Sequence, residues 1–198
     1  MNENHLPKSF FKNNPIDELS AANFLYFKIT VGMEDAFEEL LSEGMSKVGA
    51  TKRLTGSDDE KAAISALNSG EEVVAFMRTK FDVINQNRLC KKALSMQADT
   101  IPLMLRRYRT TYQDVFVDTA ALILAHAEKC YAEMLFEMYE EIRNPYAQSM
   151  ACVVFGVQRI ERAESLLLNE FKRMKKEYPQ ESLFQGPLLG LHILYEKV

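Results

Sequence analysis

The feature of this chain that most constrains its fold is a regular alternation of polarity over the C-terminal half. Three segments of mixed polarity alternate with three segments that are almost wholly apolar. In chain order the six segments cover residues 99–110, 114–127, 130–142, 147–159, 163–177 and 187–196. A helix with one apolar stripe keeps a face in water, whereas a helix that is apolar all round is buried. The alternation therefore predicts amphipathic outer helices packed on apolar inner helices.

Equivalent residues recur from one pair of segments to the next. Tyr108 is followed 31 residues later by Tyr139, and Ala121 is followed by Cys152 at the same offset. Self-similarity with a period of roughly 20 to 50 residues is typical of stacked helical repeats, because no single hairpin can bury its own apolar face. Residues 97–198 are therefore predicted to form three helical hairpins.

This pattern resembles the HEAT and armadillo class of α-α superhelices, in which each unit pairs an amphipathic outer helix with an apolar inner helix. The resemblance is one of pattern, because the units are shorter than the roughly 40 to 47 residues of such repeats. Tetratricopeptide repeats have a closer period of about 34 residues, but their W-x2-L-G-x2-Y signature is missing. The resemblance implies an all-α fold of antiparallel helical hairpins, stacked as a short right-handed superhelix.

The N-terminal half is predicted to be helical as well. Residues 1–14 are polar and are expected to be a flexible N-terminus, and residues 15–96 are expected to be a helical region packed on the repeats. Asn14-Pro15 followed by two acidic residues has the form of a helix start, which predicts a helix over 15–29. Helical spacing of apolar residues predicts another over 34–49. The whole chain is expected to be one compact unit.

Two further helical segments precede the repeats. Ser57-Asp58-Asp59-Glu60 has the form of a capping box, in which the Ser and Glu side chains satisfy free amides reciprocally, and it predicts a helix over 58–68. Between Glu71 and Met96 a helical pattern continues without Pro or Gly. This stretch is predicted to be one long helix or two helices that meet near Asn85-Gln86-Asn87.

Charge and cysteine usage bear on the partner and the compartment. The chain has 24 Lys and Arg against 28 Asp and Glu, and this net charge of −4 disfavours nucleic acid as a partner. Cys90, Cys130 and Cys152 lie among apolar neighbours and are interpreted as reduced core residues of a cytoplasmic protein. No run of 18 apolar residues and no apolar leader occur, so we expect no contact with a membrane.

No constellation of residues indicates catalysis, a cofactor or a metal. Residues 44–49 have the glycine spacing of a phosphate-binding loop, but Ala50-Thr51 follows where Lys-Ser or Lys-Thr is needed. His126 and His192 have no partner at metal-ligand spacing and are interpreted as partly buried, hydrogen-bonded side chains. A row of carboxylates is interpreted as a solvated helix face rather than an acid–base site, and consists of Glu133, Glu137, Glu140 and Glu141.

These observations predict a non-enzymatic protein-binding adaptor or scaffold. The alternative is an enzyme or a nucleic-acid-processing protein, such as a helical-repeat DNA glycosylase, with a site assembled from scattered side chains. The Met residues are interpreted mostly as core gap-fillers, although Met side chains also line adaptable binding grooves. Fold class alone does not determine function, so the prediction rests on analogy.

The predicted outer helices end in basic residues. Cations near a helix C-terminus complement the helix dipole, which accounts for each residue singly. In a stack of helices, however, these ends would align into one basic edge that attracts an acidic segment of another protein. The residues expected to bind this partner are Arg106, Arg109, Arg143, Lys172, Arg173, Lys175 and Lys176.

Overall fold

The computed structural model describes residues 6–17 and 57–195, and every regular element in these two ranges is a helix. Helices account for 77% of the described residues, which confirms the predicted all-α class. The α-helices are α1 (Lys8–Asn13), α4 (Asp58–Ala66), α5 (Gly70–Phe76), α6 (Val83–Ser95), α7 (Gln97–Tyr108), α8 (Asp114–His126), α9 (Lys129–Glu137), α10 (Pro145–Val157), α11 (Glu164–Glu177) and α12 (Gln185–Tyr195). Short 3-10 helices are η1 (Tyr139–Glu141), η2 (Glu161–Ala163) and η3 (Ser182–Phe184). Among the described helices, none has both the length and the apolar character needed to cross a membrane.

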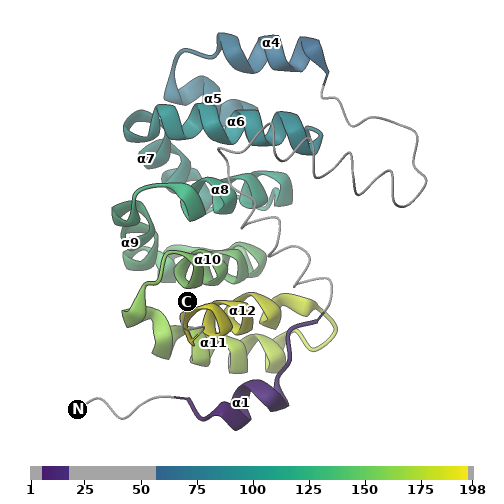
Figure 1. Cartoon of the computed structure of the whole chain (residues 1–198), viewed down its shortest axis with the longest axis vertical. Coiled ribbons are helices and arrows are strands. Elements are labelled where there is room, and N and C mark those ends of the chain that lie inside the picture. The colour runs from purple at the N-terminus through teal and green to yellow at the C-terminus, as the bar shows by residue number, and fades with distance from the viewer. Residues whose placement is uncertain (1–5, 18–56, 196–198) are drawn as a thin grey trace.

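The helices from α4 to α11 follow one another along the long axis of the molecule, and α12 lies between α10 and α11 (Figure 1). We call α6, α8, α10 and α12 the inner row, because each of them packs on the next. Helix α4 packs on α6 at one end of this row. The outer helices α5, α7, α9 and α11 flank the inner row, and α5 and α7 also pack on each other.

Three helices of the inner row, α8, α10 and α12, are buried nearly all round. In α8, every residue from Phe116 to Ala125 is buried except Asp118. In α12, the first seven residues are all buried. Among the outer helices, α11 buries only one stripe, which consists of Leu167, Phe171 and Met174. The predicted contrast between segments buried all round and segments buried along one stripe is therefore confirmed.

Helices α10 and α12 approach each other so closely at three glycines that no side chain would fit at these positions. A Cβ atom on Gly190 would lie 2.5 Å from the carbonyl oxygen of Cys152, and a Cβ atom on Gly156 would lie 2.6 Å from the Cα of Gly190. A Cβ atom on Gly186 would lie 2.3 Å from the carbonyl oxygen of Ser149. Glycine is required here because only a residue without a Cβ permits backbones to come this close.

The stretch between Glu71 and Met96 forms two helices, but they do not meet where the sequence pattern suggested. Helix α5 ends at Phe76 and α6 begins at Val83. The carboxylate of Asp82 accepts hydrogen bonds from the backbone N–H groups of Ile84 and Asn85, both at 2.9 Å. A side-chain cap therefore starts α6, and the predicted break near Asn85 was wrong because that residue lies inside the first turn.

The predicted cap at Ser57 is present in part. The Ser57 side chain accepts from the backbone N–H of Glu60, so α4 begins where it was predicted to begin. The Glu60 carboxylate, however, accepts from the side-chain amide of Asn85 at 2.7 Å and ties α4 to α6. A complete capping box occurs instead at the start of α5, between Ser69 and Glu72.

Helix α1 lies beside α11 and α12, at the opposite end of the molecule from α4 (Figure 1). The ring of Phe10 is 5.7 Å from that of Phe171, and the ring of Phe11 is 4.8 Å from that of His192. Residues 8–13 thus differ from the flexible N-terminus that was expected. Local polarity could not reveal this, because the aromatic partners of the two Phe residues lie far away in the sequence.

Asn14 was predicted to start a helix, and this prediction was wrong. Its backbone N–H donates to the carbonyl oxygen of Phe10, so Asn14 ends α1. Pro15, Ile16 and Asp17 are not helical. The remainder of the predicted helix over 15–29, the predicted helix over 34–49 and the glycine loop at 44–49 lie outside the described residues.

Candidate functional site

The basic residues at the end of α7 meet the chain that follows η1. The backbone N–H of Arg143 donates to the carbonyl oxygen of Arg109 at 3.0 Å. The Arg109 guanidinium forms an ion pair with Glu141 at 2.7 Å. Arg106, one turn before Arg109, is exposed and makes no ion pair with any described residue. Three of the seven predicted partner-binding residues, Arg106, Arg109 and Arg143, therefore lie close together in the structure.

The basic residues of α11 fall into two groups. Arg173 is turned toward α10 and is engaged in the polar network described below. The Lys175 ammonium lies over the rings of Phe171 and Phe184, at 5.4 and 5.7 Å from their centroids. Lys172 and Lys176 are exposed and have no ion-pair partner within residues 6–17 and 57–195. All three lysines of α11 are exposed, and Lys175 differs from the other two only in its contacts with aromatic rings.

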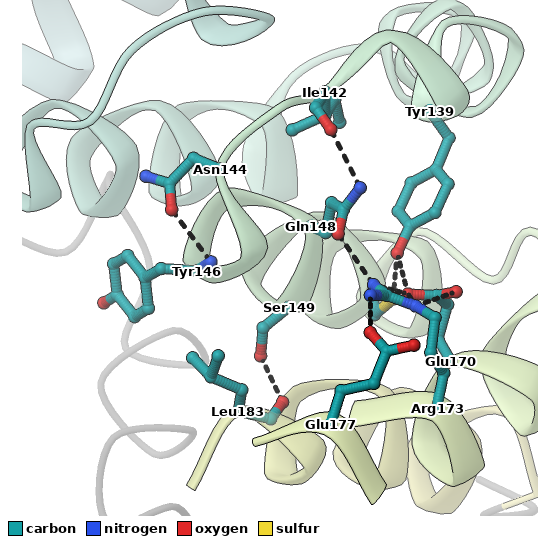
Figure 2. A network of polar contacts seen from close by, with 11 residues as sticks. Tyr139, Ile142, Asn144, Tyr146, Gln148, Ser149, Glu170, Arg173, Glu177 and Leu183 are labelled. Carbon is teal, nitrogen blue, oxygen red and sulfur yellow. Dashed lines mark hydrogen bonds and ion pairs between the residues drawn. The ribbon is translucent and has the colours of Figure 1, made fainter. Parts of the chain in front are cut away.

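Arg173 lies at the centre of a polar network that joins α11 to η1 and α10, and Figure 2 shows this network from close by. Its guanidinium donates to Glu170 at 2.6 Å and to Glu177 at 2.8 Å. A third hydrogen bond, of 2.7 Å, goes to the side-chain oxygen of Gln148 on α10. The hydroxyl of Tyr139 donates to Glu170 at 2.9 Å.

This network is a structural clamp rather than an acid–base site. Burial raises the pKa of the Tyr139 hydroxyl and of the Cys152 thiol, which are 3.7 Å apart, well above their usual ranges. The hydrogen bond to Glu170 raises the pKa of Arg173 above its usual value. A general acid or base needs a pKa near the working pH, and these three shifts move the groups away from neutrality.

Two other titratable side chains also hold helices together. Asp118 on α8 accepts a hydrogen bond from the hydroxyl of Tyr146 on α10, and burial raises the pKa of this carboxyl group. His192 lies with its Nε2 atom 3.1 Å from the carbonyl oxygen of Asn14, and His126 is half-buried at the end of α8. In the described part of the chain, no three or more His, Cys, Asp or Glu side chains are grouped to hold a metal ion.

The cysteines and the row of carboxylates differ in how well they were predicted. Cys90 and Cys152 are buried, but Cys130 is exposed, so its prediction as a core residue was wrong. Helix α9 buries Ala132 and Leu135, and Cys130 lies on its solvent-exposed face. The carboxylates of the predicted solvated face are exposed, as expected, at Glu133, Glu137, Glu140 and Glu141.

An apolar groove of about 470 Å³ lies between the outer helices α7 and α9. Pro102 and Leu105 line it from α7, and Met134 and Met138 line it from α9 and its C-cap. Most Met residues were predicted to fill gaps in the core, but Met134 is 46% exposed. The prediction fails at Met134 because the spacing of apolar residues does not reveal whether a neighbouring helix packs tightly enough to cover them.

Charged side chains edge this groove. Arg106 and Arg109 lie on the α7 side, and Glu137 lies on the α9 side, where it forms an ion pair with Arg162 at 2.6 Å. Two of the seven residues that the sequence marked for partner binding thus lie at a groove whose apolar lining sequence reasoning missed. The Met residues were the available signal, because Met side chains adapt to irregular binding surfaces.

Comparison with known proteins adds no relative: no protein family, no curated protein and no solved structure gives a significant match to this chain.

Proposed function

We propose that this protein is a non-enzymatic protein-binding adaptor or scaffold, built from helical hairpins that stack as a short right-handed superhelix of the HEAT type. The packing of each inner helix on the next supports this arrangement, since repeat units bury their apolar faces against their neighbours. The same order of packing continues through α4, α5 and α6, so the proposed stack includes residues 57–96. The sequence analysis had assigned these residues to the N-terminal helical region that packs on the repeats.

The observation that carries the proposal is the groove between α7 and α9. Soluble proteins expose large apolar side chains singly for no special reason, but an apolar hollow edged by charges is typical of a binding site. Met134 lines this hollow and is one of two large apolar side chains that are clearly exposed among the described residues; the other is Tyr112, at 68%. We propose that the groove and the basic residues beside it bind another protein.

Affinity purification of the tagged full-length chain from its native host tests this function. We expect Met134→Glu, which places a carboxylate over the apolar floor, to abolish capture of a partner that the unchanged protein retains. Tyr112→Ala is the matched control, because it changes an exposed apolar side chain that does not line the groove. Equal capture by all three proteins would contradict the proposal, as would loss of the partner with the control alone.

A further inference from the structure

The floor of the α7–α9 groove offers apolar contact but no backbone hydrogen bonds. Its lining comes from side chains of two helices, and Pro102 has no N–H to offer. The backbone groups of α7 and α9 are largely engaged within their own helices. An extended peptide laid here would leave its own N–H and C=O groups without protein partners, whereas a helix satisfies its backbone internally.

The charges at the groove do not cancel. Arg109 is paired with Glu141, and Glu137 is paired with Arg162, so each of these ion pairs is neutral. Arg106 lines the groove and has no ion-pair partner among the described residues. The groove therefore presents one uncompensated positive charge beside an apolar floor, which favours an approaching carboxylate and disfavours an approaching cation.

We infer that the groove binds a short amphipathic helix of another protein, which presents apolar side chains one turn apart and an Asp or Glu beside them. The apolar side chains contact Pro102, Leu105, Met134 and Met138, and the carboxylate pairs with Arg106. Helix-in-groove recognition of this kind uses anchors at i, i+3 or i+4, and i+7. This inference rests on the proposed function and specifies the chemistry of the partner.

A random-peptide phage library, selected on the immobilised full-length protein and counter-selected on Met134→Glu, tests the inference without assuming a partner. We expect the enriched peptides to share apolar residues at helical spacing with an excess of Asp and Glu. The same selection on Arg106→Glu should enrich Lys and Arg instead. Circular dichroism and thermal melting of both variants, whose altered side chains are exposed, establish that they fold.

Synthetic copies of the enriched acidic peptides give the quantitative readout by fluorescence anisotropy. Arg106→Glu should weaken their binding about three- to fivefold, as expected for one solvent-exposed ion pair, and added salt should reduce that difference. An absence of acidic bias, the same bias with both proteins, or equal binding to Met134→Glu would overturn the inference. If no peptide depends on Met134 while a native partner still does, the proposed function stands and the short acidic helix is wrong.

Discussion

At Arg173, one side chain links three helical elements. Its guanidinium bonds to two carboxylates of α11 and to Gln148 of α10, and Glu170 in turn accepts from Tyr139 of η1. Replacing Arg173 by Met removes the cation and leaves the Glu170 carboxylate, whose side chain is only 14% exposed, without its charge partner. We expect the free energy of unfolding to fall by about 1–3 kcal/mol in urea denaturation.

Lys172→Met is the matched control for this change, because Lys172 is the preceding residue of α11 and is exposed without a described ion pair. A substitution at such a position changes stability by less than about 0.5 kcal/mol. Equal effects of the two substitutions would show that Arg173 does not act as a clamp.

Asp118 carries a second prediction, which concerns pH. Burial raises the pKa of this carboxyl group, so between the ordinary Asp value and the raised value the folded protein binds more protons than the unfolded chain. The free energy of unfolding therefore falls as the pH rises through this window, and the loss is complete once the pH is above the raised value. Asp118→Asn keeps an oxygen acceptor for Tyr146 and cannot ionise.

We therefore expect Asp118→Asn to raise Tm at pH 7 relative to the unchanged protein. Below pH ~3, Asp118 is protonated in both the folded and the unfolded state, so the variant and the unchanged protein should have the same Tm. Thermal melting followed by circular dichroism at both pH values provides the measurement. A variant that melts lower than the unchanged protein at pH 7 would mean that the charged hydrogen bond to Tyr146 outweighs the cost of burial.

At the scale of single residues, the sequence predicted the location of charged binding residues better than it predicted which apolar side chains are buried. Arg106 and Arg109 were identified by their place at a predicted helix end, and both line the groove. Cys130 was assigned to the core and most Met residues were interpreted as core gap-fillers, but Cys130 and Met134 are exposed. The limit of an apolar stripe depends on how close the next helix lies, and residue spacing within one helix contains no information on that distance.

Among the elements, the contact of α10 with α12 depends on Gly190. Alanine at an open helical position is more stable than glycine by about 0.5–1 kcal/mol. The sign of the stability change caused by Gly190→Ala therefore shows whether there is room for a side chain at this position. Because a Cβ atom here would lie 2.5 Å from a backbone oxygen of α10, we expect Gly190→Ala to separate the helices and lower stability by about 1–3 kcal/mol in urea denaturation. Ser165→Ala on the exposed side of α11 is the control, and a stabilised Gly190→Ala would refute the close packing.

The existence of most elements was predictable, and their boundaries were less so. The polarity pattern predicted α7 to α12 to within a few residues, because each segment is apolar either along one stripe or on all sides. The start of α6 was missed because it depends on the Asp82 side chain, in a stretch whose apolar periodicity continues unbroken. Caps made by one polar side chain alter a boundary without altering the hydrophobic pattern.

At the scale of the whole molecule, different helices cover the two ends of its long axis. Helix α4 buries Ile64 and turns charged residues such as Asp58, Asp59 and Lys61 outward. At the other end, Phe10 and Phe11 of α1 cover aromatic side chains of α11 and α12. Stacked repeats need a polar cap at each end to remain soluble. In the proposed stack, α1 would serve as this cap on α11 and α12.

The dependence of each inner helix on the next can be tested by cutting the chain after Lys129. This fragment keeps α8 but loses α10, whose Gln158 donates to the carbonyl oxygens of Leu124 and Ala125 at 2.8 and 3.0 Å. It also loses α11 and α12, on which α1 packs. Because α8 is apolar on the side that α10 covers, we expect an aggregated or molten fragment that binds a hydrophobic dye. Size-exclusion chromatography and urea denaturation provide the measurement, and a soluble, monomeric fragment with cooperative unfolding would contradict the stacked arrangement.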